Sequence, residues 1–465
     1  MIQVRVAVIG LDCAAPDLIF GKLKEYLPNL SKMTSEGISG RLRSCDPPIT
    51  VPAWMVMATG RSPGELGLYG FRSRVPNSYN GIKIPTSQDI KFDTVWDILG
   101  KRNKRSIIIA VPPSYPPKPV PGILISDFLT PDRDKEFTYP PGLKNEILRD
   151  FPDYQFDVKF RKPEKKKIID EIYKMTDTRF RLAEKFIGEK EWDFFFMVEI
   201  GIDRVHHAFW RYIDEESHLY ENDEEMRNKF ISYFKMVDDH IGRMLDKFDD
   251  DTVVLVVSDH GAKRMKGAFA INQWLIREGY LKLKSSEVPK GASLEDLDID
   301  WKLSKAWAWG GYYARVFLNI KGREPEGIIE PADLRTELNR LKEKIKSIRG
   351  PNGEVWKTKV FEPEEVYKTV NGDRSDLFVY LDDLSWRAAG TLGYDTDYLL
   401  ENDTGPDDAV HDYDGIYILY RRGKKIGKVI DSSIFRIAPT ILELYRVRKT
   451  YGIQGKPLEG VEYVE

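Results

Sequence analysis

Short apolar runs that alternate with helical stretches constrain the fold of this chain more than any other feature of its sequence. The runs lie at 4–11, 106–111, 193–199, 252–257 and 415–420. An apolar run of this length that ends in Gly, Pro or an acidic residue is typical of a strand buried on both faces of a parallel sheet. Helical patterns lie between and after them, near 91–103, 164–188, 222–247 and 433–446. This order predicts an α/β fold in which a mostly parallel central sheet carries helices on both faces.

Two regions depart from the alternation of strand and helix. Residues 114–163 are rich in proline, aromatic and charged residues, and 283–372 carry charged stretches and tryptophans. We interpret both as insertions on the core and the second as a cap. The predicted organisation is a catalytic core of 1–282 and 373–465 with an inserted cap, 283–372, that selects the substrate. We expect two of its tryptophans to cover the site, Trp307 and Trp309.

Composition narrows the class of protein. The chain has 465 residues, of which 42% are hydrophobic and 31% charged, as expected for a globular protein with a sizeable core. The net charge of −3 gives no basic excess, so we predict no nucleic-acid polymer as partner. Charged residues are dense and glutamine is scarce, a bias of hyperthermophile proteins.

The N-terminal residues and the cysteines bear on location. The first apolar run is short and ends in Gly-Leu-Asp, so we interpret it as a strand and not as a signal peptide. No stretch approaches the ~20 apolar residues of a membrane span, and we expect a cytoplasmic protein. Cys13 and Cys45 cannot form a disulfide framework and are interpreted as small buried residues.

The motif Ser258-Asp259-His260-Gly261 carries the clearest chemical signal. It follows the apolar run 252–257 directly, so Asp259 and His260 are expected at the rim of the sheet. Ligands of α/β sheets bind at that rim, whereas the alternative role of this pair is to cap the next turn. The motif therefore predicts two adjacent metal ligands.

A second pair of candidate ligands follows the run 193–199. Asp203 and His207 are four residues apart, so one helical turn places them on the same face, where they can bind one divalent ion. His206 points elsewhere on such a turn and is interpreted as a packing residue. Two more single candidates follow or precede predicted strands, Asp12 and His411. The remaining histidines are interpreted as solvated surface residues, His218 and His240.

Thr50 is the candidate nucleophile. It lies between prolines in Pro47-Pro48-Ile49-Thr50-Val51-Pro52, and a helix is expected from about Ala53 to Gly60. Free amides and the helix dipole favour an anion at such an N-terminus. A threonine there is commonly a helix cap, but its hydroxyl can also act as a nucleophile that a metal activates.

In order, these elements resemble the type I phosphodiesterase/nucleotide pyrophosphatase family of the alkaline phosphatase superfamily. The similar pattern is a strand-end Asp, a Thr between prolines, D-x-x-x-H, S-D-H-G and a late His, and it extends from Asp12 to His411. Two further passages look similar to prokaryotic members of the family, beginning at Lys266 and at Ala438.

The resemblance implies an alkaline phosphatase-like core and a centre of two divalent metal ions, usually zinc, with manganese also suited to such ligands. Thr50 would form a phospho-threonine intermediate while the chain hydrolyses a small phosphorylated substrate. The first ion would be bound by Asp12, Thr50, Asp259 and His260. The second would be bound by Asp203, His207 and His411.

One position departs from the family pattern. In H-G-I-x-x-N the Asn binds the phosphate, but here the stretch is Leu66-Gly67-Leu68-Tyr69-Gly70-Phe71, so Phe71 replaces that Asn. A nearby arginine, Arg72 or Arg74, can take over the phosphate, or both can be plain surface residues.

Other readings of the same motifs remain open. A sulfatase needs Cys or Ser followed by x-Pro-x-Arg, and Thr50-Val51-Pro52-Ala53-Trp54 argues against one. A phosphomonoesterase is an alternative, and so is a cofactor-independent phosphoglycerate mutase, which Thr50 disfavours without removing because the mutase uses serine. A phosphonate hydrolase and a non-catalytic metal-binding module complete the alternatives. The sequence does not indicate the oligomeric state.

Overall fold

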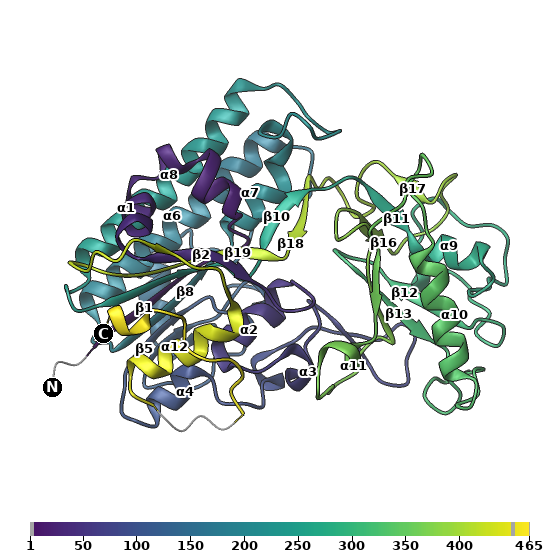
Figure 1. Ribbon diagram of the computed structural model, residues 1–465, viewed down its shortest axis with the longest axis horizontal. Coiled ribbons are helices and arrows are strands. Elements are labelled where there is room, and N and C mark those ends of the chain that lie inside the picture. The colour runs from purple at the N-terminus through teal and green to yellow at the C-terminus, as the bar shows by residue number, and fades with distance from the viewer. Residues whose placement is uncertain (1–3, 448–451, 465) are drawn as a thin grey trace.

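The computed structural model describes residues 4–447 and 452–464, which form two lobes (Figure 1). The larger lobe is built on a ten-stranded sheet and contains both ends of the described chain. Its strands, in spatial order, are β20 (Lys428–Val429), β2 (Ile38–Arg43), β19 (Asp414–Arg421), β9 (Val253–Val257), β1 (Val6–Leu11), β8 (Phe194–Glu199), β5 (Ser106–Ile109), β6 (Gly122–Ile125) and β7 (Thr138–Tyr139), with β21 (Ser432–Ser433) also paired to β2.

The centre of this sheet is parallel, as the sequence predicts. Strands β9, β1, β8, β5 and β6 run in parallel, whereas β19 is antiparallel to both of its neighbours. Alternate residues of β1 face opposite sides, so Ala7 and Ile9 enter one apolar core while Val6 and Val8 enter the other. The sheet is therefore buried on both faces, which explains why its strands read as continuous apolar runs.

Helices cover each face of the sheet (Figure 1). The first core contains buried residues of five α-helices, α1 (Pro28–Glu36), α5 (Leu143–Asp150), α6 (Lys165–Glu189), α7 (Gly201–Phe209) and α8 (Glu224–Lys247). The second contains buried residues of four, α2 (Thr50–Thr59), α3 (Pro63–Leu66), α4 (Val95–Gly100) and α12 (Ile437–Leu444). The predicted helices at 164–188 and 222–247 thus correspond closely to α6 and α8.

The smaller lobe is built on a four-stranded antiparallel sheet and a three-stranded one. The first has the order β12 (Ala306–Trp309), β13 (Ala314–Leu318), β15 (Leu377–Tyr380), β14 (Lys359–Phe361), and the second the order β16 (Arg387–Ala389), β11 (Ala268–Ala270), β17 (Tyr398–Leu399). Two helices pack with them, α9 (Ile271–Arg277) and α10 (Leu334–Lys346). The predicted cap region supplies β12, β13, α10 and β14, and chain on either side of it supplies the rest.

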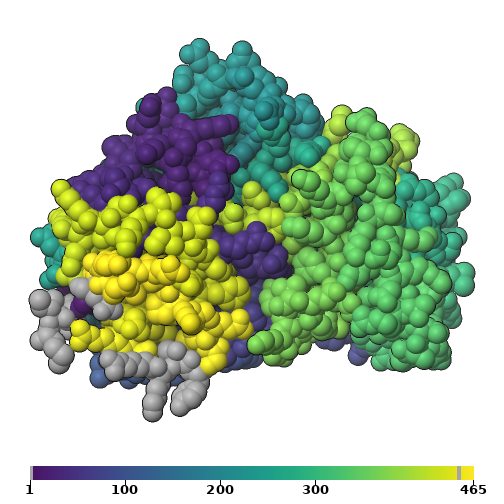
Figure 2. Space-filling view, viewed as in Figure 1, coloured from purple at the N-terminus to yellow at the C-terminus, as the bar shows by residue number. Residues whose placement is uncertain are grey.

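A two-stranded ribbon, β10 (Gly261–Arg264) with β18 (Ala409–Asp412), lies between the lobes (Figure 1). In the space-filling view the green surface of the smaller lobe abuts the larger lobe directly (Figure 2). Within the described part of the chain, no helix combines the length and apolarity needed to cross a membrane.

Two expectations about local structure are wrong. The helix expected from Ala53 begins at Thr50 itself, because the extended backbone of Ile49 supplies the cap position. Residues 114–163 are not an insertion on the core, because β6 and β7 of this region pair at the edge of the main sheet.

The prediction that His240 is a solvated residue is also wrong. The side chain is fully buried between α8 and α6, with Nδ1 at 2.6 Å from a carboxylate oxygen of Glu184 and Nε2 at 3.2 Å from one of Asp177. Its ring stacks on Phe180 with a centroid separation of 4.9 Å. These contacts give the buried ring polar partners on a second helix, which makes its burial tolerable. His218, by contrast, is exposed as expected.

Trp307, which we expected to cover the site, belongs to the core of the smaller lobe. It is fully buried and stacks on Phe317 with a centroid separation of 5.3 Å. We therefore predict that Trp307→Ala lowers the free energy of unfolding by about 3–5 kcal/mol, as for other buried aromatic truncations. Chemical denaturation followed by circular dichroism measures this, with Leu303→Ala, at a side chain 62% exposed, as the matched control. An equal, small effect of both substitutions would contradict the assignment.

Candidate active site

The predicted carboxylate ligands lie where three adjacent parallel strands end. β9, β1 and β8 are neighbours in the sheet, and their carboxyl ends lead into Asp259, Asp12 and helix α7. Asp203 is the third residue of α7. Because carboxyl ends of parallel strands share one edge of a sheet, this topology gathers all three carboxylates there. All three are buried.

The ribbon of β10 and β18 brings His411 to the same edge. β10 continues directly from the Ser258–Gly261 motif, and Ala262 pairs with His411 across the ribbon. The rings of His260 and His411 stack with a centroid separation of 3.8 Å. Two histidines distant in sequence are therefore adjacent in space.

Thr50 faces these side chains from the first turn of α2. We call them the ligand cluster: Asp12, Asp203, His207, Asp259, His260 and His411. Its Oγ1 lies 3.2 Å from Nε2 of His260, and its side chain is 1% exposed. The hydroxyl accordingly points at the ligand cluster.

Close packing of α2 on the sheet fixes Asp12. Nε1 of Trp54 donates a hydrogen bond of 2.7 Å to Oδ2 of Asp12. The indole can approach only because residue 10 is glycine, since a Cβ there would lie 2.5 Å from the ring. Oδ1 of Asp12 is left to face the cluster.

The three histidines of the cluster all donate a hydrogen bond through Nδ1. Nδ1 of His260 lies 3.1 Å from the carbonyl oxygen of Gly261, and Nδ1 of His411 lies 2.9 Å from that of Pro48. Nδ1 of His207 lies 3.0 Å from the carbonyl oxygen of Ala409. A carbonyl oxygen can only accept, so Nδ1 is a donor in each ring, and Nε2 of His260 and His411, whose pKa values are lowered by burial, carries a free lone pair. This is the arrangement of histidines that bind metal through Nε2. Despite burial, Asp407 and Asp203 instead raise the pKa of His207.

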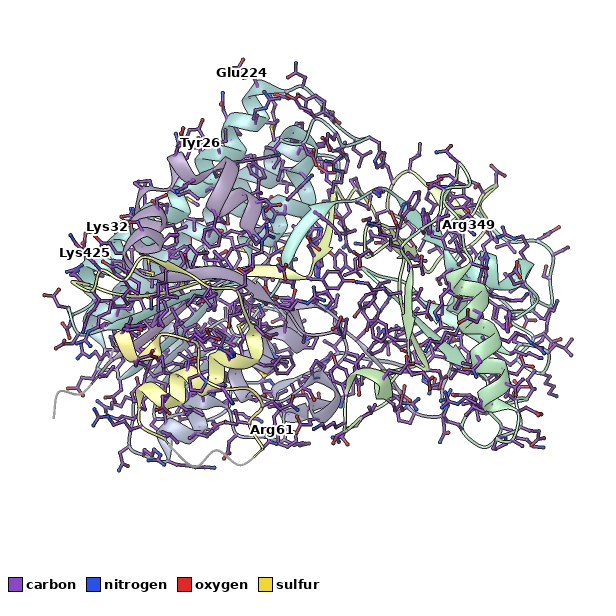
Figure 3. The ribbon with its side chains drawn as sticks, in the orientation of Figure 1. Tyr26, Lys32, Arg61, Glu224, Arg349 and Lys425 are labelled. Carbon is purple, nitrogen blue, oxygen red and sulfur yellow. The ribbon has the colours of Figure 1, made fainter. Side chains whose placement is uncertain are left out.

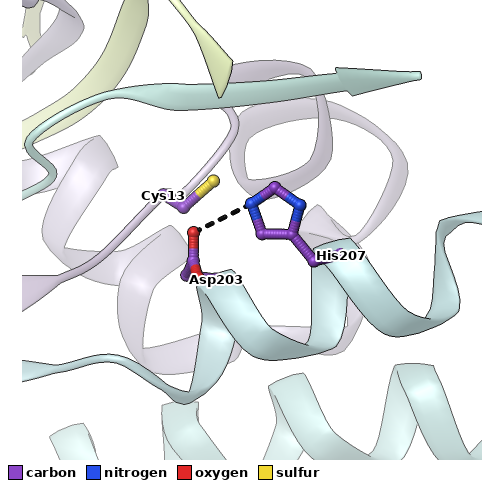
Figure 4. A group of neighbouring side chains, drawn as sticks. All are labelled: Cys13, Asp203 and His207. Atoms are coloured by element: carbon purple, nitrogen blue, oxygen red, sulfur yellow. Dashed lines mark ion pairs between the residues drawn. The ribbon is translucent and has the colours of Figure 1, made fainter. Parts of the chain in front are cut away.

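Several buried polar atoms of the cluster have no hydrogen-bond partner. They are Oδ1 of Asp12, Oδ2 of Asp203, Oδ2 of Asp259 and Nε2 of His207. The Asp203 and His207 atoms lie 3.1 Å from each other as an ion-pair contact, so the Asp12 and Asp259 oxygens are the clearest cases (Figure 4). Buried polar atoms are nearly always paired, so an unpaired group of this kind requires an explanation such as a missing ion. Ligand atoms of Asp12, Asp259 and His260 lie within 4.8 Å of one another, as do those of Asp203, His260 and His411. These carboxylate oxygens and imidazole nitrogens suit divalent cations as ligands.

The pKa shifts of these residues also fit a site for a cation. Burial raises the pKa of Asp12 and of Asp259 well above the ordinary value, and neighbouring carboxylates raise both further. At Asp203 burial is outweighed by the charges of His207 and Arg204, so its pKa is lowered. Burial lowers the pKa of His260 to about 4 and holds that of His411 well below its usual range. Neutral imidazoles beside crowded carboxylates suit a cation.

Cys13 adjoins the ligand cluster, although sequence reasoning assigned it to packing alone. It is buried as expected, but Sγ lies within 4.8 Å of ligand atoms of Asp203 and His207 (Figure 4). Its Sγ also lies 3.4 Å from the carbonyl oxygen of Gly261. The available signal was its position directly after Asp12. His206 fits its predicted packing role, with its ring among Trp210, Phe230 and Phe234.

Two further residues that the sequence did not single out hold the histidines in place. Oδ1 of Asp407 lies 2.7 Å from Nδ1 of His207. The N–H group at Nδ1 therefore has two acceptors, this carboxylate oxygen and the carbonyl oxygen of Ala409. Tyr312, from the smaller lobe, stacks on His411 with a centroid separation of 3.8 Å. The second contact closes the cluster from the side of the smaller lobe.

A cavity of about 560 Å³ lies between the lobes beside the cluster. Phe71 and Trp309 line it, so Trp309 fits its predicted place whereas Trp307 does not. Of the two arginines considered for phosphate binding, Arg72 lines the cavity. Arg74 is committed elsewhere, because it is buried in ion pairs with Glu324 and Asp373.

Comparison with known proteins agrees with this geometry. A sequence model of the family described as type I phosphodiesterase / nucleotide pyrophosphatase matches residues 6–407. That range contains every ligand of the cluster except His411. A comparison with curated proteins found no match.

Proposed function

The chain belongs to the type I phosphodiesterase/nucleotide pyrophosphatase family of hydrolases, and from this premise we propose that it cleaves phosphodiester or pyrophosphate bonds with Thr50 as nucleophile at a centre for two divalent metal ions. The observation that carries the proposal is that buried oxygen and nitrogen atoms without a hydrogen-bond partner gather around a threonine hydroxyl at a helix N-terminus. A structural role for these residues would leave that convergence unexplained.

Seven residues would bind the two ions. The first set is Asp12, Thr50, Asp259 and His260, and the second is Asp203, His207 and His411. Such ions, when bound, stabilise the charge of attacking and leaving oxygens during in-line displacement. We propose zinc, with manganese as the second choice, because the ligands are imidazole nitrogens and carboxylate oxygens.

The chain's own groups then perform two displacements. Oγ1 of Thr50, having lost its proton to solvent, attacks phosphorus, and the bond to the leaving oxygen breaks, giving a phospho-threonine and an alcohol or phosphate that takes up a proton from water. Water attacks the same phosphorus in the second step, and Thr50 recovers its proton as the product leaves. The N-terminus of α2 favours the developing negative charge.

We predict a preference for diesters over monoesters. The cation nearest the ligand cluster, Arg204, is already neutralised, since it pairs with Asp203 at 2.5 Å and with Asp157 at 2.7 Å. Phe71 adds an apolar wall where a polar phosphate ligand is usual. The extra charge of a monoester therefore finds no free counter-charge beside phosphorus, and we expect kcat/KM for an aryl diester to exceed that of the matched monoester by about ten-fold or more.

Steady-state kinetics with bis(4-nitrophenyl) phosphate and 4-nitrophenyl phosphate, both with added zinc, test the proposal because the two esters share a leaving group. Turnover of the diester at the higher kcat/KM supports it. A clear monoester preference would assign the chain to phosphatase or mutase chemistry instead. Absence of turnover of either ester, with zinc or manganese, would contradict the hydrolase mechanism.

A further inference from the structure

Two arginines in the cavity wall lack a carboxylate partner. Arg72 and Arg315 both lie beside Trp309, with their guanidinium carbons 5.6 Å and 4.9 Å from the indole centroid. In the described part of the chain no carboxylate lies within ion-pair distance of either, and the hydrogen bonds given for their side chains end on the carbonyl oxygens of Gly310 and Arg72. Arg315 is only 7% exposed. A buried guanidinium normally has an acidic partner, so this pair is unusual.

The other arginines that line the cavity each form an ion pair with at least one carboxylate. Arg204 pairs with two aspartates, and Arg161 and Arg387 both pair with Asp407, at 3.0 Å and 2.9 Å. These contacts serve to position the ligands of the cluster. Arg72 and Arg315 support no comparable network, so their charge is available to a bound molecule.

An aromatic wall connects the ligand cluster with the arginine pair. Arg204, next to Asp203 in the chain, lies 5.6 Å from the ring centroid of Phe128, and Phe128 meets Phe71 edge-on at 6.2 Å. Phe71 precedes Arg72. A substrate bound at the cluster can thus extend along apolar rings to two free positive charges.

No acidic residue in the described part of the cavity wall forms an ion pair with Arg72 or Arg315, although the charges of Glu295 and Asp403 partly offset the lowering of the pKa of Arg72 by burial. Asp403 accepts hydrogen bonds from the backbone amides of Gly390 and Thr391, at 3.0 Å and 3.3 Å. Glu295 is exposed and lies beyond ion-pair distance from Arg72. Asp157 is paired with Arg204.

We propose that Arg72, Arg315 and Trp309 form an anion subsite, so that the substrate is a diester whose second substituent is apolar near phosphorus and carries a carboxylate or phosphate at its far end. The inference rests on the proposed function and adds the substrate class. Guanidinium groups suit both oxyanions because they donate paired N–H groups in one plane.

The test compares 4-nitrophenyl diesters that differ only in the second substituent: phenyl, 4-carboxyphenyl, 4-phosphonophenyl and 4-(aminomethyl)phenyl. Their binding to the full-length Thr50→Ala protein in zinc-containing buffer is measured by calorimetry, which requires no turnover. We expect the acidic diesters to bind about ten-fold more tightly than the phenyl diester, the gain from one charge-assisted contact, and the cationic diester to bind more weakly. The tighter of the two acids identifies the natural group.

Second substitutions in the same background identify the residues responsible. Arg72→Gln, at an exposed side chain, should remove most of the advantage, and Arg315→Lys should reduce it. Arg349→Gln is the matched control, because Arg349 is exposed on the smaller lobe, which also contains Arg315, and lies outside the cavity lining (Figure 3). Equal binding of acidic and phenyl diesters, or an advantage that is undiminished in both Arg72→Gln and Arg315→Lys, would overturn the subsite.

Failure of the subsite can be told from failure of the proposed function. If the wild type hydrolyses the phenyl diester but binding shows no acidic advantage, the hydrolase mechanism stands and the subsite is refuted. If the acidic advantage depends on Arg72 but no diester is hydrolysed by the wild type, the subsite stands and the mechanism is refuted.

Discussion

Replacing Thr50 with alanine is expected to lower kcat for phosphodiester hydrolysis by about 10⁴-fold or more, the size of effect seen when an enzyme loses its nucleophile. The substitution removes the hydroxyl that lies 3.2 Å from Nε2 of His260 and leaves the rest of the cluster unchanged. Thr50→Ser should retain part of the activity, because it keeps an oxygen in the same position.

Thr59→Ala is the matched control for this prediction. Thr59 is also a buried threonine and ends the same helix, where its hydroxyl donates to the carbonyl oxygen of Met55 at 2.6 Å. We expect that substitution to affect stability and to leave kcat nearly unchanged. Steady-state rates of the purified variants decide the matter, and undiminished turnover by Thr50→Ala would indicate a water nucleophile instead.

Removing the metal ions is expected to abolish hydrolysis, and zinc or manganese should restore it.

Asp259→Asn should lower activity by several orders of magnitude even when metal is supplied, since an amide is a poor substitute for a ligating carboxylate. The same variant should be no less stable than the metal-free wild type. Burial raises the pKa of Asp259, so above its unfolded pKa the ionised carboxylate destabilises the fold, and a neutral amide removes that cost.

Asp238→Asn provides the control for a buried aspartate outside the cluster. Its carboxylate accepts hydrogen bonds from the backbone amides of Asn29 and Leu30, at 2.9 Å and 2.8 Å, and serves the fold. Burial raises the pKa of Asp238 too, but both of its oxygens accept a backbone N–H, so an amide nitrogen in place of one of them should lower stability. The chelator sensitivity of the variant should stay that of the wild type. Activity assays before and after chelation, with thermal unfolding of the metal-free proteins, test both variants. Full activity of the chelated wild type would refute the metal requirement.

Local sequence pattern was enough to predict the framework of the site. Buried parallel strands are apolar on both faces, so β1, β8 and β9 stand out as runs, and the polar residues after them must meet at one edge. Asp12, Asp203 and Asp259 were found in that way. Thr50 was found because prolines and a helix start surround it.

Contacts made across the fold carry no such local signal. Asp407 meets His207, and Tyr312 meets His411, only because the ribbon and the smaller lobe close on the sheet edge. The ion pairs that occupy Arg74 join it to Glu324 and Asp373, which are also far from it in the sequence. His240 is a partial exception, since its spacing from Val237 and Met244 puts it on the buried face of α8, but its surrounding charges suggested solvent.

The most direct test of the two-metal account is anomalous diffraction at the zinc absorption edge from crystals of the full-length protein grown with zinc. The account predicts two anomalous peaks at the edge of the main sheet. One should lie among Asp12, Thr50, Asp259 and His260, and the other among Asp203, His207 and His411. A single peak, no peak at this edge, or peaks that leave Thr50 out of contact with any ion would contradict it.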